Sequence, residues 1–133
     1  MREYARVSPQ FWIGHTGREI REHGPAAQVL AMYLLTSPHA NMIGLYYLPK
    51  IYMAHETGLA PKSVGDALTA LARLGFCSYD DATEVVWVTE MARYQLGEVK
   101  PNHKQAIGAA ALYACAPVCS MLGAFHDRYV DRI

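Results

Sequence analysis

Apolar residues recur at helical spacing in the middle of the chain. From Pro61 onward they are separated by three or four positions, the pattern of an amphipathic helix, and they are Val64, Ala67, Leu68, Leu71 and Leu74. Pro49 can begin a preceding helix and Gly58 can end it, because glycine readily adopts the left-handed backbone common at helix ends. The stretch 49–75 therefore predicts a helix-turn-helix, in which two helices meet at a tight turn.

Strand patterns flank these two helices. Residues 43–48 are rich in β-branched and aromatic side chains, which favours a strand. Residues 76–79 and 84–88 predict a β-hairpin around turn-forming residues at 80–83. A strand, two helices and a hairpin in this order indicate a winged helix, with 76–89 as the wing.

The second strand of the wing is apolar at consecutive positions. Alternation puts Val85 and Trp87 on one face of this strand and Val86 and Val88 on the other. We expect both faces to be covered, one by the core and one by an N-terminal element or another subunit.

Further elements are expected before this unit. Residues 25–36 predict a helix with almost no polar face, as expected of a helix that is covered on several sides. A short strand is expected at 3–7. A short helix is expected from Gly17 to Glu22, because Thr16 and Glu19 have the spacing of a capping box.

Helical segments are also expected after the wing, near 90–97, 101–114 and 121–132. The predicted fold class is thus α+β and mostly helical: a winged helix-turn-helix with N- and C-terminal helical extensions. The winged-helix domain would span 1–104. The C-terminal helical extension at 105–133 would pack on that domain or on a partner.

Composition adds limits on location and partners. Only 18% of the residues are charged and 52% are hydrophobic, so some apolar surface is expected to meet a partner. The uncharged stretch 25–48 has an apolar helical part of about a dozen residues, shorter than the ~20 that span a membrane. An odd number of cysteines with no disulfide framework, and an N-terminus without an apolar signal segment, favour a cytoplasmic location.

The second helix of the turn motif could read DNA. Opposite its apolar stripe it presents Lys62, Ser63, Asp66, Thr69, Ala70 and Arg73. Lys62 can meet a guanine or a phosphate, and Ser63 can bond to a base or to the backbone. Asp66 would repel phosphates unless it faced a cytosine. A solvated helix face is the alternative interpretation.

Charge elsewhere limits the DNA hypothesis. The net charge is zero, which argues against strong non-specific DNA binding by the domain alone. Residues 76–92 contain four carboxylates and no Lys or Arg, whereas a wing that grips DNA usually needs a basic tip. The best positive cluster follows the wing. The predicted DNA contacts are Lys62, Ser63, Arg73, Arg93, Lys100 and Lys104.

Aromatic side chains offer another route to nucleic acid. Exposed rings can stack on unpaired bases, and the candidates are Tyr46, Tyr47, Tyr52, Trp87 and Tyr94. Burial in the core or in an interface is the other interpretation of these residues.

Enzymatic and metal-binding patterns are weak, so no catalytic residue, metal or cofactor is predicted. Cys115 and Cys119 are separated by three residues and lack a paired set of zinc ligands. His55-Glu56 resembles the start of a metalloprotease motif, but Leu59 stands where its second histidine would be.

Longer stretches carry a resemblance to a known group. They are MREYARVSPQFWIG at 1–14, SPHANMIGLYYLP at 37–49, AHETGL at 54–59, GFCSYD at 75–80, VVWVTEMARYQLGE at 86–98, Lys100-Pro101-Asn102 and LGAFHDRY at 122–129. Together they resemble the N-terminal winged-helix domain of phage and prophage replication proteins, the replisome-organiser and helicase-loader group. The chain departs from this group at Ala60-Pro61-Lys62, where a hydroxyl cap would be usual.

The resemblance implies a role at a phage replication origin, with binding to DNA, to other subunits or to host replication proteins. We therefore expect a non-catalytic module that binds duplex origin DNA, or single-stranded DNA, and that self-associates. The first alternative is a winged helix that assembles the replisome through protein contacts without touching DNA. The second alternative is a transcription regulator.

Overall fold

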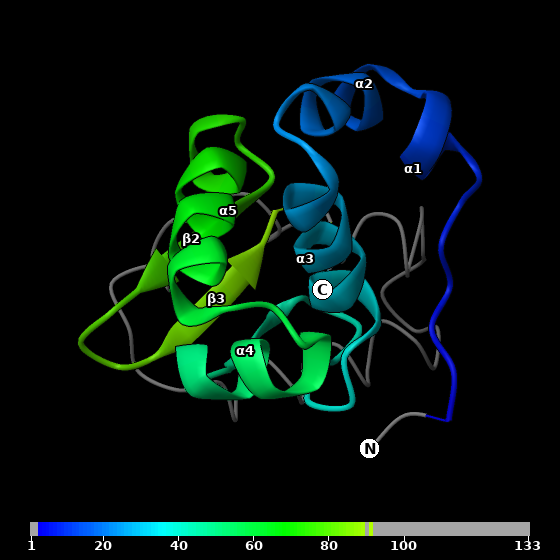
Figure 1. Ribbon diagram of the computed structural model, residues 1–133. Coiled ribbons are helices and arrows are strands. Elements are labelled where there is room, and N and C mark those ends of the chain that lie inside the picture. Colours follow the sequence, from blue (N-terminus) through cyan, green and yellow to red (C-terminus); the bar gives the residue numbers. More distant parts are fainter. Residues whose placement is uncertain (1–2, 90, 92–133) are drawn as a thin grey trace, which may run out of the picture.

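Five helices and three short strands lie along residues 3–89 and residue 91, the part of the chain that the computed structural model describes (Figure 1). The fold is α+β, as predicted. In chain order the elements are α1 (Gln10–Ile13), α2 (His15–Glu22), α3 (Pro25–Thr36), β1 (Leu45–Tyr47), α4 (Lys50–Thr57), α5 (Pro61–Arg73), β2 (Cys77–Asp80) and β3 (Val85–Val88).

Helix α3 lies at the centre of the core. Its predicted bounds are confirmed, because Pro25 opens its first turn and the extended Ser37 ends it before Pro38. Four of its side chains are fully or almost fully buried: Ala27, Leu30, Ala31 and Leu34. None of the described helices has the length and apolar character needed to cross a membrane.

Helices α4 and α5 form the predicted pair. Gly58 ends α4 with a left-handed backbone at φ 78°, and Pro61 stands in the first turn of α5. The residue before Pro61 is Ala60, the N-cap, which offers no side-chain hydrogen bond, as expected from the sequence. The apolar stripe of α5 is buried at Val64, Ala67, Leu68 and Leu71, and it packs against α3.

The three strands form one antiparallel sheet in the order β1-β3-β2. Leu45 pairs with Trp87 between β1 and β3, and Cys77 pairs with Val88 between β2 and β3. The hairpin prediction is confirmed. Strand β1 is shorter than the predicted 43–48, because Gly44 turns the chain at φ 75° just before it. The side chain of Asn41 supports this turn by accepting the Gly44 N–H at 2.9 Å.

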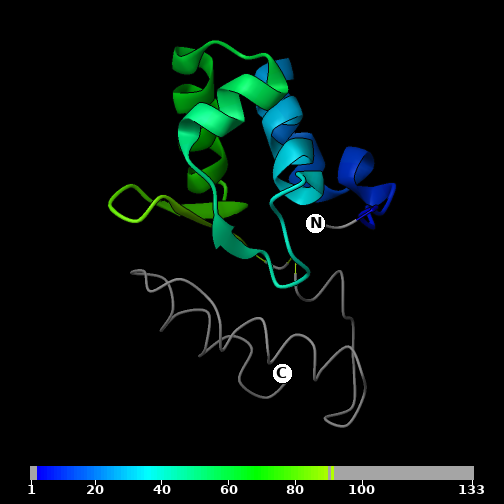
Figure 2. The same cartoon turned by 90° about the horizontal axis from the view of Figure 1, so that it is seen from below.

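Both faces of β3 are buried, as the sequence predicted. Val86 and Val88 belong to the main core beneath the helices. Val85 and Trp87 point to the other face and are 0% and 7% exposed. The described helices lie on one side of the sheet (Figure 2), so the element that covers the second face stays a prediction.

Two sequence predictions near the N-terminus are wrong. Residues 3–7 form no strand, and they pair with neither edge strand of the sheet, β1 or β2. The capping box is also absent: α2 begins at His15, two residues before Gly17, and its N-cap is Gly14. Glu19 instead pairs with His15 one turn away. The helices predicted beyond residue 91, with the extension at 105–133, lie outside the described residues.

Gly44 should tolerate a side chain less well than Gly58 does. The two have similar φ values of 75° and 78°, but a Cβ at Gly44 would lie 2.7 Å from the Met91 Cβ, whereas Gly58 faces open space. We expect Gly58→Ala to lower the free energy of unfolding by about 1 kcal/mol through left-handed strain alone. Gly44→Ala should lower it by about 1–3 kcal/mol more through overpacking.

Urea unfolding of the two variants beside the unaltered protein measures this difference. Gly58→Ala is the matched control for backbone strain. Equal destabilisation of the two variants would mean that the close approach of Gly44 to Met91 contributes nothing.

Candidate nucleic-acid interface

One face of α5 gathers the helix's predicted contact residues. Lys62, Asp66, Thr69 and Arg73 are spaced by four, three and four residues, so they lie along one stripe, and all four are exposed. Ser63 is half-buried beside this stripe. The stretch from Lys62 to Arg73 rises about 16 Å along the helix. The structure therefore brings together Lys62, Ser63 and Arg73 from the predicted set.

The charges of this stripe are available to a ligand. Lys62, Asp66 and Arg73 form no ion pair in the part of the chain that the structure describes. The stripe thus carries two positive charges and one negative charge. Because no side chain caps α5, the N–H groups of Lys62 and Ser63 in its first turn also remain able to meet a phosphate, whereas Pro61 has no N–H.

The hairpin is less acidic than its own sequence indicates. The Lys50 Nζ atom, at the start of α4, lies 2.7 Å from the Asp81 carboxylate and 5.5 Å from the centre of the Tyr79 ring. The Asp80 carboxylate accepts the Ala82 N–H at 3.0 Å. Sequence reasoning missed the Lys50 contact because its partners lie far apart along the chain. The hairpin tip is therefore tied to α4, but it presents no basic side chain to DNA.

The positive cluster predicted after the hairpin lies outside the described residues. Arg93, Lys100 and Lys104 all follow residue 91, and so does the predicted stacking residue Tyr94. Their contribution to a DNA surface stays a prediction.

The remaining candidates for base stacking differ in how far their side chains are buried. Tyr46 is 3% exposed and donates its hydroxyl to the Leu34 carbonyl at 2.6 Å, and Trp87 is 7% exposed. These two side chains belong to the interior. Tyr47 and Tyr52 are 49% and 41% exposed, and their rings meet edge to face at 6.5 Å. The His39 ring lies 5.1 Å from the Tyr52 ring.

A polar network beside these rings ties α4 to α3. One carboxylate oxygen of Glu56 accepts a hydrogen bond from the Tyr33 hydroxyl, and it also lies 2.8 Å from Nε2 of His39. The hydrogen bond from Tyr33 is the main cause that lowers the pKa of Glu56. Burial and the same carboxylate raise the pKa of Tyr33. No local pattern in the sequence indicates this network, because its members lie 17 and 23 residues apart.

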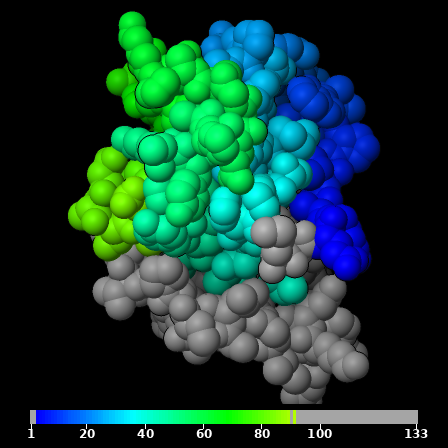
Figure 3. Space-filling model, turned by 60° about the horizontal axis from the view of Figure 1, so that its bottom comes forward, coloured from blue at the N-terminus to red at the C-terminus, as the bar shows by residue number. Residues whose placement is uncertain are grey.

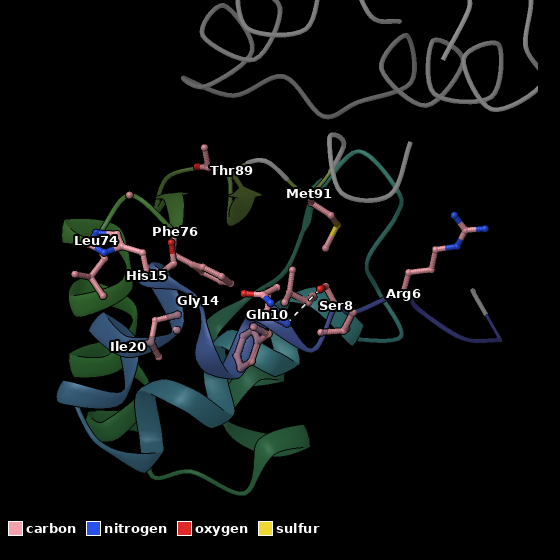
Figure 4. A pocket seen from close by; sticks show the side chains of 16 residues that line it. Arg6, Ser8, Gln10, Gly14, His15, Ile20, Leu74, Phe76, Thr89 and Met91 are labelled. Atoms are coloured by element: carbon pink, nitrogen blue, oxygen red, sulfur yellow. Dashed lines mark hydrogen bonds between the residues drawn. The ribbon is translucent and has the colours of Figure 1, made fainter. Parts of the chain in front are cut away.

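A cavity of about 460 Å³ lies at the C-terminal end of α5 (Figure 4). Apolar parts of its described lining come from Ile20, Leu74, Phe76 and Met91. Ser8 and Gln10 line it from the N-terminal segment, and the Gln10 N–H donates to the Ser8 hydroxyl at 3.2 Å. The predicted DNA contacts are not among the described lining residues, so the cavity is separate from the α5 stripe.

The structure offers no metal centre within residues 3–89 and residue 91, where His, Cys, Asp and Glu form no group of three or more that could hold an ion. Cys77 is buried, and burial raises the pKa of its thiol to about 12, so the thiolate form is strongly disfavoured. Cys115 and Cys119 lie outside the described residues.

Comparison of the chain with protein-family models, with curated proteins and with solved structures found no match.

Glu56 should stabilise the fold most strongly above its ordinary pKa of 4.5. Its pKa is lowered in the folded state, so its contribution is complete above the unfolded pKa and is lost as the pH falls through the folded pKa. We expect Glu56→Gln to unfold at lower urea concentration than the unaltered protein at pH 7. The difference between the urea concentrations at which the two proteins unfold should narrow as the pH falls below 4.5.

Combining Glu56→Gln with Tyr33→Phe shows whether the Tyr33 hydroxyl is the cause of the stability change. If the Tyr33 hydroxyl supplies most of the effect, Glu56→Gln will destabilise the protein less in the Tyr33→Phe background. A stability difference between Glu56→Gln and the unaltered protein that stays constant across the pH range would rule out the proposed role of the Glu56 charge.

Proposed function

We propose that this chain is a non-catalytic winged-helix module that binds duplex DNA through α5. The observation that carries the proposal is the element order α3-β1-α4-α5-β2-β3 with a β1-β3-β2 antiparallel sheet. In a winged helix the second helix of the turn motif enters the major groove, and here that helix is α5. The hairpin β2–β3 is then the wing.

The α5 stripe has the chemistry for such a contact. Lys62 and Ser63 stand in the N-terminal half of the helix, which in helix-turn-helix proteins lies nearest the base edges. Arg73 lies about three turns away on the same face, where it suits a backbone phosphate. Asp66 between them opposes phosphate binding. Modest intrinsic affinity is therefore part of the proposal.

The setting we propose is DNA replication in a phage or prophage. The stretches that resemble phage replication proteins, above all those at 37–49 and 86–98, support it. The proposal includes duplex origin DNA as the main ligand and single-stranded DNA as a further one. It also includes self-association, contacts with phage or host replication proteins, and a cytoplasmic location.

A winged helix that assembles proteins without touching DNA is the second candidate. Two observations favour it: the hairpin offers carboxylates and no basic side chain, and Tyr47, Ile51 and Tyr52 leave apolar surface exposed beside it. A transcription regulator would share the fold and would differ in its target sequence.

Removing positive charge from α5 should weaken DNA binding in a salt-dependent way. We expect Lys62→Ala and Arg73→Ala each to lower the affinity for duplex DNA. Each should also reduce the slope of log affinity against log salt, by about 0.9 for every phosphate that the variant no longer neutralises. Asp66→Asn should raise the affinity. Titrations of duplex and single-stranded DNA at several salt concentrations measure these effects.

Arg21→Ala is the matched control, since Arg21 is an exposed arginine on α2 and lies outside the α5 stripe. Its slope should equal that of the unaltered protein. Absence of binding at low salt by a folded, unaltered protein would refute the DNA proposal and leave the protein-assembly candidate.

A further inference from the structure

Two exposed apolar patches lie at opposite ends of the described structure. The first, here the α1 patch, consists of Trp12 and Ile13, which are 49% and 57% exposed. The second, here the tyrosine patch, consists of Tyr47, Ile51 and Tyr52, which are 49%, 73% and 41% exposed. Figures 1 and 2 both show α1 on the side away from the hairpin and the start of α4.

The tyrosine patch is held by two elements and lies beside carboxylates. The rings of Tyr47 and Tyr52 are perpendicular, at 89°, and strand β1 and helix α4 position them. Tyr47 pairs with Val85 across the sheet, and the Leu48 N–H donates to the Glu84 carbonyl at 2.7 Å, so Glu84 stands next to this patch. After desolvation, its carboxylate also raises the pKa of the Tyr47 hydroxyl. Lys50 is the nearby cation, and Asp81 pairs with it. The carboxylate beside Tyr47 therefore suits a cationic partner.

The α1 patch lies beside a guanidinium group. Phe11 supports Trp12 edge to face, with ring centres 4.8 Å apart. The Arg18 Nε atom donates to the Ile13 carbonyl at 3.2 Å, which holds this cation against the patch. The Glu19 carboxylate on the same helix pairs with His15. Glu22, one turn beyond Arg18, is the other acidic residue of α2.

We propose that copies of this chain associate head to tail, with the α1 patch of one copy seated on the tyrosine patch of the next. Each patch is apolar and each has a neighbouring charge of opposite sign, Arg18 on one side and Glu84 on the other. The zero net charge of the chain leaves no overall repulsion between copies. A contact between two different surfaces leaves one of each free at the ends, so the assembly grows by addition of further copies.

The proposed function includes self-association. This inference rests on that proposal and names the surfaces through which the copies would associate. It does not require DNA. Space-filling atoms show the hairpin and α4 on one side and the N-terminal residues on the other (Figure 3), so one copy can use both patches at once.

Sedimentation velocity of the full chain without DNA, over a wide range of concentrations, tests the proposal with two variants. Ile13→Asp removes the α1 patch and leaves the tyrosine patch intact, whereas Ile51→Asp does the reverse. Both side chains are exposed, so circular dichroism should show unchanged folding. We expect the average mass of the unaltered protein to rise continuously with concentration, and each variant alone to associate at least about tenfold more weakly.

Mixing the two variants gives the decisive result. The intact tyrosine patch of Ile13→Asp can bind the intact α1 patch of Ile51→Asp, so the mixture should form a dimer and nothing larger. Ala72→Asp, at an exposed position of α5 outside both patches, is the control and should behave as the unaltered protein.

Three results would overturn the head-to-tail contact. They are an unaltered protein that stays monomeric at every concentration, variants that associate as well as the unaltered protein, and a mixture that remains monomeric. A symmetric dimer through a single patch gives the second result in the variant that keeps this patch, because that variant would then carry the intact patch on both copies. Failure of DNA binding in the salt titrations would leave this outcome unchanged, so the two proposals fail separately.

Discussion

The packing of α5 against α3 is the interaction on which the described structure depends. Val64, Leu68 and Leu71 give α5 a single apolar stripe, and burial of that stripe determines how the helix is rotated about its axis. Helix α3 can receive it because α3 is apolar on nearly all sides and also contacts α2 and α4. The polar stripe of α5 then has to face outward, so the core determines which residues a ligand could meet.

Several carboxylates of this sparsely charged protein are held by hydrogen bonds or ion pairs. Glu19 pairs with His15, Glu56 is held by Tyr33 and His39, and Asp81 is held by Lys50. These contacts each join two turns or two elements, so those carboxylates serve the fold. Lys62 and Arg73 take part in no such pair within the described residues. A chain without net charge thereby keeps unpaired cations on one helix face, where an anionic ligand would need them.

The sequence predicted the elements whose signals are local. The period of the α5 stripe, Gly58 at the end of α4 and the apolar run of α3 each located an element to within a residue or two. Prediction failed where the outcome depended on distant partners or on competing contacts. Residues 3–7 pair with neither edge strand of the sheet, and Glu19 pairs with His15 instead of capping α2. The α5 stripe could be predicted as a site because helical spacing places it. The contacts of Lys50 and Glu56 could not, since they join residues from different elements that lie far apart along the chain.

Strand β3 and the tip of its hairpin differ sharply in their surroundings. Every side chain from Val85 to Val88 is buried on one face or the other, so a polar replacement there would enter the interior. Asp81 and Ala82 at the tip are exposed, only a few residues away. Selection can therefore act on the two parts separately. The tip can change its length, and its composition apart from the Lys50–Asp81 pair, while the strand that supports it stays nearly fixed.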